Sequence, residues 1–207
     1  LDNEDINTEL TRGEFAIYAA KLLNKNLEGG ADVRYFKDVD PNSRAAKSIH
    51  FLYENGIVNG REDGTFGTNE KISTFDAAVI LLRIAGYEAY AKVEDYQALI
   101  AQNEILKGVL GTNVTVLNMA KMFYNTLITP VCVIDQYNGG MPTYNIDEDY
   151  LLMEKLFSMY EVRGILNGAD GICIKEGLSC SDKTAIIGNE VYEVNEALAQ
   201  RMYYDLG

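Results

Sequence analysis

The sequence is short of several residue types on which common catalytic and metal sites depend. Its 207 residues include no tryptophan, one histidine and three cysteines. One imidazole supports few metal or acid–base arrangements, and three cysteines do not make a disulfide framework. Neither a Gly-x-Ser-x-Gly nucleophile turn nor a Gly-x-x-x-x-Gly-Lys phosphate loop occurs. We therefore expect no catalytic residue, no metal and no cofactor.

Positive charge is also scarce. The chain has 18 Lys and Arg against 31 Asp and Glu, a formal net charge of −13. Such an acidic surface repels nucleic-acid phosphates and anionic lipids. No apolar run approaches the roughly 20 residues of a membrane span, and no basic-then-apolar leader opens the chain. The sequence predicts no nucleic-acid partner and no membrane span, in a protein that is either cytosolic or already processed.

The pattern of apolar residues changes near Thr129-Pro130. Before this point they recur at helical spacing, and after Tyr160 short alternating or β-branched runs dominate. We expect an α+β protein, with an all-α helical repeat domain at 1–129 and a small α+β domain at 130–207 that residues beyond Gly207 would complete. The second domain should open with a helix at about 147–158, its acidic residues at the N-terminal end. Its short, mostly antiparallel strands are expected at 160–166, 171–175, 185–187, 190–194 and 201–204, with a hairpin turn at Gly188-Asn189.

The helical part repeats itself. Residues 10–16, 72–78 and 114–120 each place a hydroxyl residue three positions before Glu, Asp or Asn. Thr11 with Glu14 is a capping-box pattern, in which the hydroxyl accepts a first-turn N–H and the carboxylate reaches back to the cap. An apolar stripe follows each cap and predicts one buried helix face. The repeats are expected at about 1–29, 30–88 and 93–129.

A second element precedes two of the capped helices. A helix stops at Gly56 or near Glu104, and a short turn follows that ends at Gly60 or Gly108. After Gly60 the loop is expected to bury Phe66, whereas the corresponding loop after Gly108 is six residues shorter. One such unit leaves its apolar stripe uncovered, so several units must pack together.

Together these pieces resemble the S-layer homology module of bacterial cell-surface proteins. The residues that carry the resemblance are Leu10-Thr11-Arg12-Gly13-Glu14-Phe15, Phe36-Lys37-Asp38-Val39, Gly56-Ile57-Val58-Asn59-Gly60 and Asp63-Gly64-Thr65-Phe66. Residues 36–87 resemble one full repeat, 8–24 the second half of a preceding repeat, and 93–128 a third, degenerate repeat. Residues 144–207 resemble the mixed α/β segment that follows such repeats in some large bacterial surface proteins.

The resemblance implies a secreted, extracellular protein associated with the cell wall or S-layer. It implies a helical bundle whose grooves bind an anionic, often pyruvylated, secondary cell-wall polysaccharide. Arg12 would be a principal contact, because a guanidinium forks onto a carboxylate. Thr74 and Val116 stand where the other two repeats would carry arginine, so at most one groove keeps its cation. The other expected groove residues are Glu14, Gly60, Arg61, Ser73 and Thr74.

The sequence leaves two non-catalytic functions open. The chain attaches to the wall by non-covalent polysaccharide binding, or it is a diverged module for protein–protein contact or surface-layer self-assembly without polymer binding. Its partner is accordingly the polysaccharide or another surface protein. A wall hydrolase would need paired carboxylates within residues 144–207, a segment that is small for an enzyme.

Asp38, Asp40 and Asn42 alternate like the start of a calcium-binding loop. Ser43 stands where that loop needs glycine, and Ile49 where it needs a bidentate acid. We therefore expect Asp38 or Asp40 to cap a helix that begins at residue 41 or 42.

Four further residues also have simple structural interpretations. Arg12 either contacts a ligand, or it pairs with Glu9 or is simply exposed beside the cap. Cys173 and Cys180 either pair across a hairpin or remain free thiols. His50, between apolar neighbours, is expected to be a structural residue.

Overall fold

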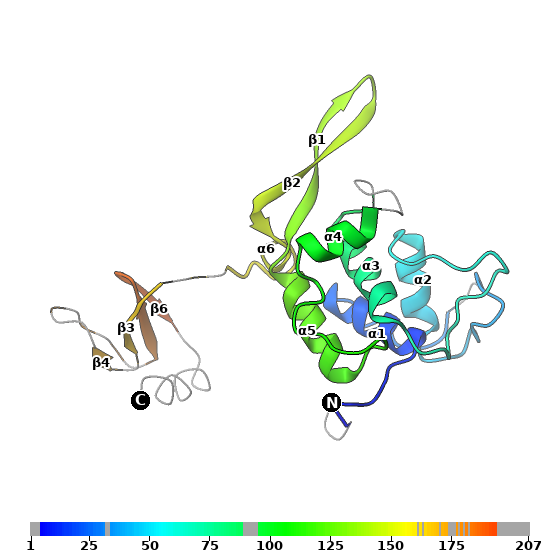
Figure 1. Ribbon diagram of the computed structural model, residues 1–207, viewed down its shortest axis with the longest axis horizontal. Helices are drawn as coiled ribbons and strands as arrows, with labels where there is room; N and C mark the ends of the chain where they lie inside the picture. The colour runs from blue at the N-terminus through cyan, green and yellow to red at the C-terminus, as the bar shows by residue number, and fades with distance from the viewer. Residues whose placement is uncertain are drawn as a thin grey trace. The chain divides into compact units, whose positions relative to one another are not determined.

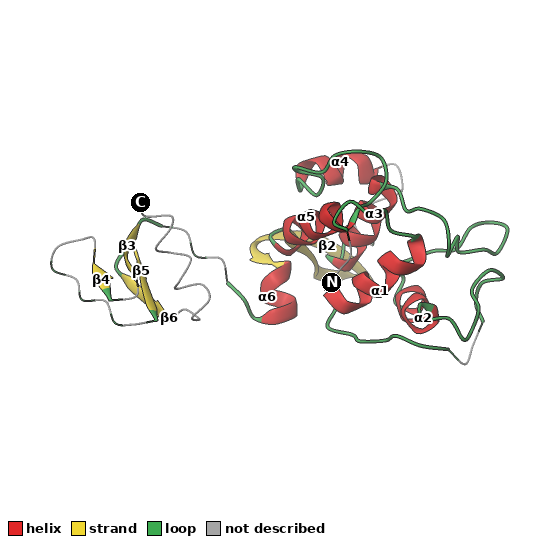
Figure 2. Cartoon of the chain, turned by 90° about the horizontal axis from the view of Figure 1, so that it is seen from below, coloured by secondary structure: helices red, strands yellow, loops and turns green. Residues whose placement is uncertain are grey.

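The chain folds into two compact units, residues 1–159 and 160–207. The computed structural model describes residues 5–31, 34–88, 95–160, 162, 164–169, 171–173, 177, 179, 181 and 183–193. The first unit continues past the boundary that we predicted near Thr129-Pro130. Helices form the body of this unit, and a β-hairpin extends from it, whereas the second unit carries a small antiparallel sheet (Figures 1 and 2). The fold is therefore α+β, as the sequence predicts.

Three capped helices alternate with two shorter ones in the first unit. The helices are α1 (Arg12–Leu22), α2 (Ala46–Glu54), α3 (Thr74–Ile84), α4 (Tyr96–Gln102) and α5 (Val116–Leu127). The predicted caps of α1, α3 and α5 are confirmed: each cap hydroxyl accepts the backbone N–H three residues on. The complete capping box, with the side chain also reaching back, is present at Thr11 and Glu14.

A closed ring of backbone hydrogen bonds joins the three capped helices just before they begin. The Leu10 N–H donates to the Val114 carbonyl at 2.8 Å, Val114 to Ile72 at 3.0 Å, and Ile72 to Leu10 at 3.1 Å. All three side chains are buried, at 3% exposure or less. The ring relates the three capped helices by an approximate three-fold arrangement, which gives the sequence repeat a structural counterpart.

Each capped helix is also tied to the segment that leads into the next one. The first N–H of α1 donates to Glu70 at 2.8 Å, that of α3 to Thr112 at 2.8 Å, and that of α5 to Thr8 at 3.1 Å. The order is cyclic. The segment before α3 supplies the carbonyl that accepts from α1, the segment before α5 accepts from α3, and the segment before α1 accepts from α5. The three inter-repeat junctions at the starts of α1, α3 and α5, which we call the first, second and third grooves, are therefore equivalent in their backbone hydrogen bonds.

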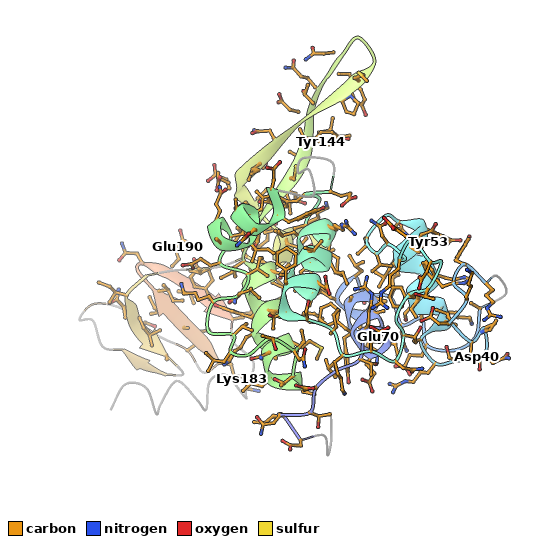
Figure 3. The ribbon with its side chains drawn as sticks, turned by 45° about the vertical axis from the view of Figure 1, so that its right-hand side comes forward. Asp40, Tyr53, Glu70, Tyr144, Lys183 and Glu190 are labelled. Atoms are coloured by element: carbon orange, nitrogen blue, oxygen red, sulfur yellow. The ribbon has the colours of Figure 1, made fainter. Side chains whose placement is uncertain are left out.

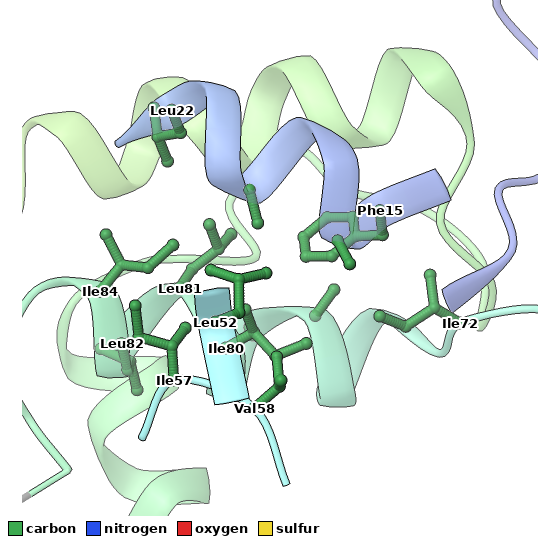
Figure 4. Close-up of a cluster of buried hydrophobic side chains, with 14 of the residues drawn as sticks. Phe15, Leu22, Leu52, Ile57, Val58, Ile72, Ile80, Leu81, Leu82 and Ile84 are labelled. Atoms are coloured by element: carbon green, nitrogen blue, oxygen red, sulfur yellow. The ribbon is translucent and has the colours of Figure 1, made fainter. Parts of the chain in front are cut away.

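The core lies where the apolar stripes of the capped helices meet α2 and the turn after it. Figure 4 shows Phe15 and Leu22 of α1 facing Leu52 of α2 and the side chains of α3. Phe15 and Leu52 have no exposed area. The predicted stripe along α1 is confirmed at Phe15, Ala19 and Leu22, all of which are buried. Burial of each large apolar side chain of this kind stabilises the fold by roughly 1.5–3 kcal/mol.

The predicted cap before α2 is wrong. The helix begins at Ala46, with no side-chain cap, rather than at residue 41 or 42. The Asp38 carboxylate instead accepts the N–H groups of three successive residues, Phe66 at 2.6 Å, Gly67 at 2.7 Å and Thr68 at 3.0 Å. Asp40 accepts the Asn42 N–H at 2.9 Å in a local turn ahead of the helix. The Asp38 carboxylate therefore bonds to the backbone of residues 66–68, which are distant in sequence, and does not cap α2.

The first unit also contains a hairpin that the sequence analysis did not predict. β1 (Pro130–Asn138) pairs antiparallel with β2 (Met141–Leu151) around a Gly139-Gly140 turn, in which both glycines have positive φ. The base of the hairpin is anchored in the core: Val131 is fully buried, and the Cys132 N–H donates to the Ala85 carbonyl at 3.0 Å. The outer half, towards the turn, is exposed (Figure 1).

The helix expected at 147–158 is shorter than predicted. α6 (Leu152–Phe157) begins only after β2 ends, and Asp147, Glu148 and Asp149 belong to the strand. Asp147 pairs with Val131, and β2 continues through Glu148 and Asp149, across a register irregularity, to Leu151 opposite Pro130. The acidic residues therefore do not lie at a helix N-terminus, as we expected.

The second unit holds a four-stranded antiparallel sheet in the order β4-β3-β5-β6. Its strands are β3 (Leu166–Ala169), β4 (Ile172–Cys173), β5 (Thr184–Ile187) and β6 (Glu190–Glu193). The turn predicted at Gly188-Asn189 is confirmed, since Ile187 pairs with Glu190 across it. The strand predicted at 160–166 is wrong in extent, because β3 begins only at Leu166. Cys180 and the strand predicted at 201–204 lie outside the described residues.

Candidate ligand-binding groove at the start of α1

Arg12 is the first residue of α1 and lies against the loop of the second repeat. Its guanidinium carbon lies 4.8 Å from the centroid of the Phe66 ring, within cation–π range. One terminal nitrogen, Nη2, donates to the Asn59 carbonyl at 3.3 Å. The Nε atom is buried and has no hydrogen-bond partner. The side chain is thus held in place by its flat face and one nitrogen, with hydrogen-bonding capacity left over.

The ion pair between Arg12 and Glu9 that we considered does not form. The Glu9 carboxylate accepts from the Asn113 amide at 3.1 Å, and its backbone carbonyl accepts from Lys71 at 2.5 Å. The salt bridges of the described residues do not include Arg12. The interpretation of Arg12 as an ion-pair partner of Glu9 is therefore excluded.

Burial lowers the pKa of Arg12 from its ordinary value, and the Asp76 carboxylate acts in the opposite direction. The charges of Arg61 and Arg83 add to the lowering. An arginine pKa starts so high that the guanidinium stays charged at neutral pH. A cation is therefore held here partly desolvated, where an opposite charge interacts more strongly than in open water.

The two neighbouring arginines are already neutralised. Arg61 forms a two-pronged pair with Glu70, both contacts at 2.6 Å. Arg83, whose side chain is only 10% exposed, pairs with Glu88 at 2.5 Å. Figure 3 labels Glu70 beside α1. Positive charge without a carboxylate partner thus concentrates at Arg12 in this groove.

Two packing contacts place the aromatic ring beneath Arg12. Phe66 is fully buried, as predicted, and lies 5.4 Å from the Phe36 ring, centroid to centroid. Gly60 packs against the Phe36 ring, where a Cβ would come within 2.3 Å of the ring. Asp38 holds the backbone of Phe66 from the far side of the loop. The groove wall therefore depends on residues that are distant in sequence.

The backbone N–H groups of the first turn of α1 are not available to a ligand. Arg12 donates to the Glu70 carbonyl, Gly13 to the Thr68 carbonyl at 3.0 Å, and Glu14 to the Thr11 hydroxyl at 3.1 Å. The helix dipole still contributes a field at this end, but no free amide points outward from these three residues. Anion recognition in this groove therefore rests on the guanidinium.

The predicted site residues divide between two grooves. Gly60 and Arg61 lie on the loop that contacts Arg12. Glu14 accepts the Thr11 N–H at 2.7 Å and serves the cap. Ser73 and Thr74 begin α3, where the Thr74 N–H donates to Thr112, so they belong to the next groove.

Sequence reasoning overlooked Asn59 and Asp76 as neighbours of Arg12. Asn59 contacts Arg12 through its backbone carbonyl, and the type of its side chain does not indicate such a contact. Asp76 is the third residue of α3, and its repeat position had been read only as part of a cap.

Three capped helices joined by a ring of backbone hydrogen bonds define a helical module built from repeats. Residues 35–78 match the family model described as the S-layer homology domain. The chain therefore contains an S-layer homology domain, and the match spans α2, the loop that carries Phe66 and the start of α3. No curated protein matches the chain.

S-layer homology domains are non-catalytic modules that anchor proteins to the cell wall through wall polymers or surface proteins. The domain implies association with the cell surface. In the part of the chain that the structure describes, no helix is long and apolar enough to cross a membrane. Nor do these residues include a cluster of three or more His, Cys, Asp or Glu side chains placed to hold a metal ion.

Proposed function

We propose that the chain attaches to the cell wall by non-covalent binding of an anionic secondary cell-wall polysaccharide at Arg12. The observation that carries this proposal is the guanidinium itself, laid on Phe66 with Nε unpartnered and no carboxylate pairing with it. A carboxylate of the polymer would take the two-pronged geometry that Glu70 takes on Arg61 in the same loop.

Binding through this groove alone is expected to be weak. The positions equivalent to Arg12 are Thr74 in α3 and Val116 in α5, both largely buried. Three cationic grooves on one polymer would raise the overall affinity by effective concentration, and one groove gains nothing in this way. The net charge of −13 adds no general attraction to an anionic polymer.

Co-sedimentation with wall sacculi, before and after removal of their secondary polymer, tests this function. We expect the whole chain to pellet with the sacculi only when the polymer is present, and Arg12→Ala should abolish this. Arg12→Lys should weaken it, because lysine keeps the positive charge but cannot donate two parallel hydrogen bonds to a carboxylate. Lys25→Ala is the matched control, since it removes an exposed cation just beyond the other end of α1. Polymer-dependent pelleting that Arg12→Ala leaves intact would refute the site, and absence of wild-type pelleting would refute the function.

The second candidate is self-assembly of surface copies without polymer. Its support is the outer half of the β1–β2 hairpin, where Ile134, Tyr137 and Met141 are 49%, 66% and 75% exposed. A two-stranded ribbon is marginally stable alone, so a partner that covered these side chains would stabilise it. Sedimentation velocity of the wild type and of a Tyr137→Ser, Met141→Ser variant distinguishes the candidates. Concentration-dependent association that the variant loses would favour assembly.

A further inference from the structure

The two faces of the β1–β2 hairpin differ in polarity. Cross-strand partners share one face of a ribbon, and successive pairs alternate between the faces. One face is apolar along its length, and its pairs are Cys132 with Ile146, Ile134 with Tyr144 and Tyr137 with Pro142. The other face has an amide or hydroxyl in each outer pair, which are Val133 with Asn145, Gln136 with Thr143 and Asn138 with Met141. We call the outer part of the apolar side, Ile134, Tyr137, Pro142 and Tyr144, the ribbon face.

A β-bulge at Asp135 makes the ribbon face continuous. Ile134 and Tyr137 are three residues apart, which would place them on opposite faces of a regular strand. The register shifts between Ile134 and Gln136, with Asp135 as the extra residue, and this shift returns Tyr137 to the face of Ile134. Both side chains are exposed. The backbone irregularity thus gathers apolar side chains on one exposed surface, which is typical of an interaction site.

The ribbon is also acidic. β1 and β2 contain Asp135, Asp147, Glu148 and Asp149 but no lysine or arginine. Two such ribbons packed against each other would bring like charges together, which is unfavourable. The surface that complements this ribbon is therefore apolar or aromatic, with basic residues around it.

An exposed aromatic surface lies on the outer side of α2. The Tyr35 ring lies 4.6 Å from the His50 ring and 5.0 Å from the Tyr53 ring, centroid to centroid. Tyr35 and Tyr53 are 40% and 39% exposed. The cluster is held in place, because the Tyr35 hydroxyl donates to Glu54 at 2.8 Å and Tyr53 contacts the buried Phe36 ring at 5.0 Å. We call Tyr35, His50 and Tyr53 the aromatic patch.

Three exposed basic residues lie beside the aromatic patch. Arg34 directly precedes Tyr35, Lys37 follows two residues later, and Lys47 lies one turn of α2 before His50. Arg34 and Lys37 donate to backbone carbonyls. The salt bridges found among the described residues include none of these three side chains. The patch therefore has the combination of aromatic rings and unpaired positive charge that complements the acidic ribbon.

We propose that the ribbon face of one copy packs on the aromatic patch of the next copy, so that copies associate head to tail. The proposal rests on self-assembly, the second candidate function, and names its two surfaces. Figure 3 shows Tyr144 on the hairpin and Tyr53 on α2, at separate places on the first unit. One contact thus leaves a ribbon face free on one copy and an aromatic patch free on the other, and each can bind a further copy.

Sedimentation velocity of the whole chain tests the proposal. We expect species larger than a dimer that grow with concentration. Tyr137→Ser should weaken association at least about tenfold, because an exposed aromatic anchor is lost. Its matched control is Met141→Ser, which removes an apolar side chain from the opposite face and should stay within about twofold of the wild type. The patch variant, Tyr35→Ser with Lys47→Glu, should weaken association at least about tenfold, whereas Lys121→Glu, the same charge change on α5, should not.

Mixing the variants tests the pairing of the two surfaces directly. The Tyr137→Ser chain keeps its aromatic patch, and the patch variant keeps its ribbon face. An equal mixture should therefore form one-to-one pairs that grow no further. Raising the salt from about 0.1 M to about 1 M shortens the screening length from about 10 Å to about 3 Å. This should weaken association of the wild type, since the contact joins an acidic surface to a basic one.

Three results would overturn the proposal. If the patch variant associates like the wild type and the mixture forms no pairs, head-to-tail contact is wrong although self-assembly stands. Wild-type association that stops at a dimer, or that strengthens with salt, would equally exclude it. Absence of wild-type association would refute self-assembly itself. The substituted side chains are at least partly exposed, so the variants are expected to fold, and their amide spectra verify this.

Discussion

Replacing Asp38 by alanine should destabilise the first unit by about 2–3 kcal/mol. The carboxylate accepts three backbone N–H groups of residues 66–68, at 2.6, 2.7 and 3.0 Å. Hydrogen bonds to a charged acceptor contribute about 1.5–3 kcal/mol when shielded. Asp38 is exposed to solvent, so we assign roughly 1 kcal/mol to each of the two shorter bonds and less to the third. For a unit of this size the loss corresponds to a Tm lowered by roughly 4–12 °C.

Urea unfolding followed by circular dichroism at 222 nm measures this change. Among the described residues all α-helices belong to the first unit, so the helical signal reports on that unit. Asp40→Ala is the matched control: Asp40 lies two residues away and makes a local contact to Asn42, so its loss should change stability far less. Equal effects of Asp38→Ala and Asp40→Ala would refute the reasoning.

The same contact predicts a pH dependence. Burial by itself raises the pKa of Asp38, but the N–H groups of Phe66, Thr68 and Gly67 outweigh it and hold the pKa below its ordinary value of 3.8. A carboxyl with a depressed folded-state pKa contributes its full stabilisation above its unfolded value and loses it as pH falls through the folded value. The stability gap between the wild type and Asp38→Asn should therefore be constant near neutrality and shrink below about pH 4. A gap that does not change with pH would contradict this.

Three further substitutions follow from the structure. Gly60→Ala should cost about 1–3 kcal/mol in urea unfolding, because its Cβ would lie 2.3 Å from the Phe36 ring; an unchanged midpoint would contradict this. Glu104→Gly should raise stability by roughly 0.5–1 kcal/mol by relieving the left-handed backbone, after the entropy cost of glycine; a loss of stability would count against it. The Glu28 carboxyl should titrate by NMR with a pKa of about 2, owing first to Arg44 and then to Lys21, and Arg44→Gln should raise that value.

The capped helices can be predicted from sequence because their signals are local. A hydroxyl, a Glu, Asp or Asn three residues on and an apolar stripe together specify a helix start within a few residues, and α1, α3 and α5 begin where this pattern predicts. The turn at Gly188-Asn189 is equally local. Such features need no knowledge of what packs against them.

The features that sequence reasoning missed depend on distant partners. Asp38 bonds to residues 66–68, and no spacing rule connects positions so far apart. Residues 147–149 look like an acidic helix start, but they belong to β2, where Asp147 pairs with Val131 of β1. A usable signal did exist for the hairpin: Gly139-Gly140 lies between two runs with β-branched and aromatic residues.

The candidate site shows the same contrast between features with local sequence signals and features that depend on distant partners. Arg12 is recognisable from its motif, whereas its contact with Asn59 is made by a backbone carbonyl and leaves no trace in residue type. Ser73 and Thr74 were grouped with Arg12 because their repeats align. The cyclic order of the grooves places them one groove further on. Residues can be assigned to grooves only from the backbone hydrogen bonds between repeats, which the sequence repeat does not reveal.

The ring also explains why the grooves can diverge in chemistry without loss of the fold. Its bonds join backbone atoms of Leu10, Ile72 and Val114, and the first helical N–H of each capped helix bonds to a backbone carbonyl as well. Neither set of bonds depends on which side chain occupies the first or second helical position. Arginine, threonine and valine at the first position are therefore all compatible with the same scaffold, provided that the caps and the buried ring residues remain. The side chains of one groove can therefore change while those of the other two stay the same.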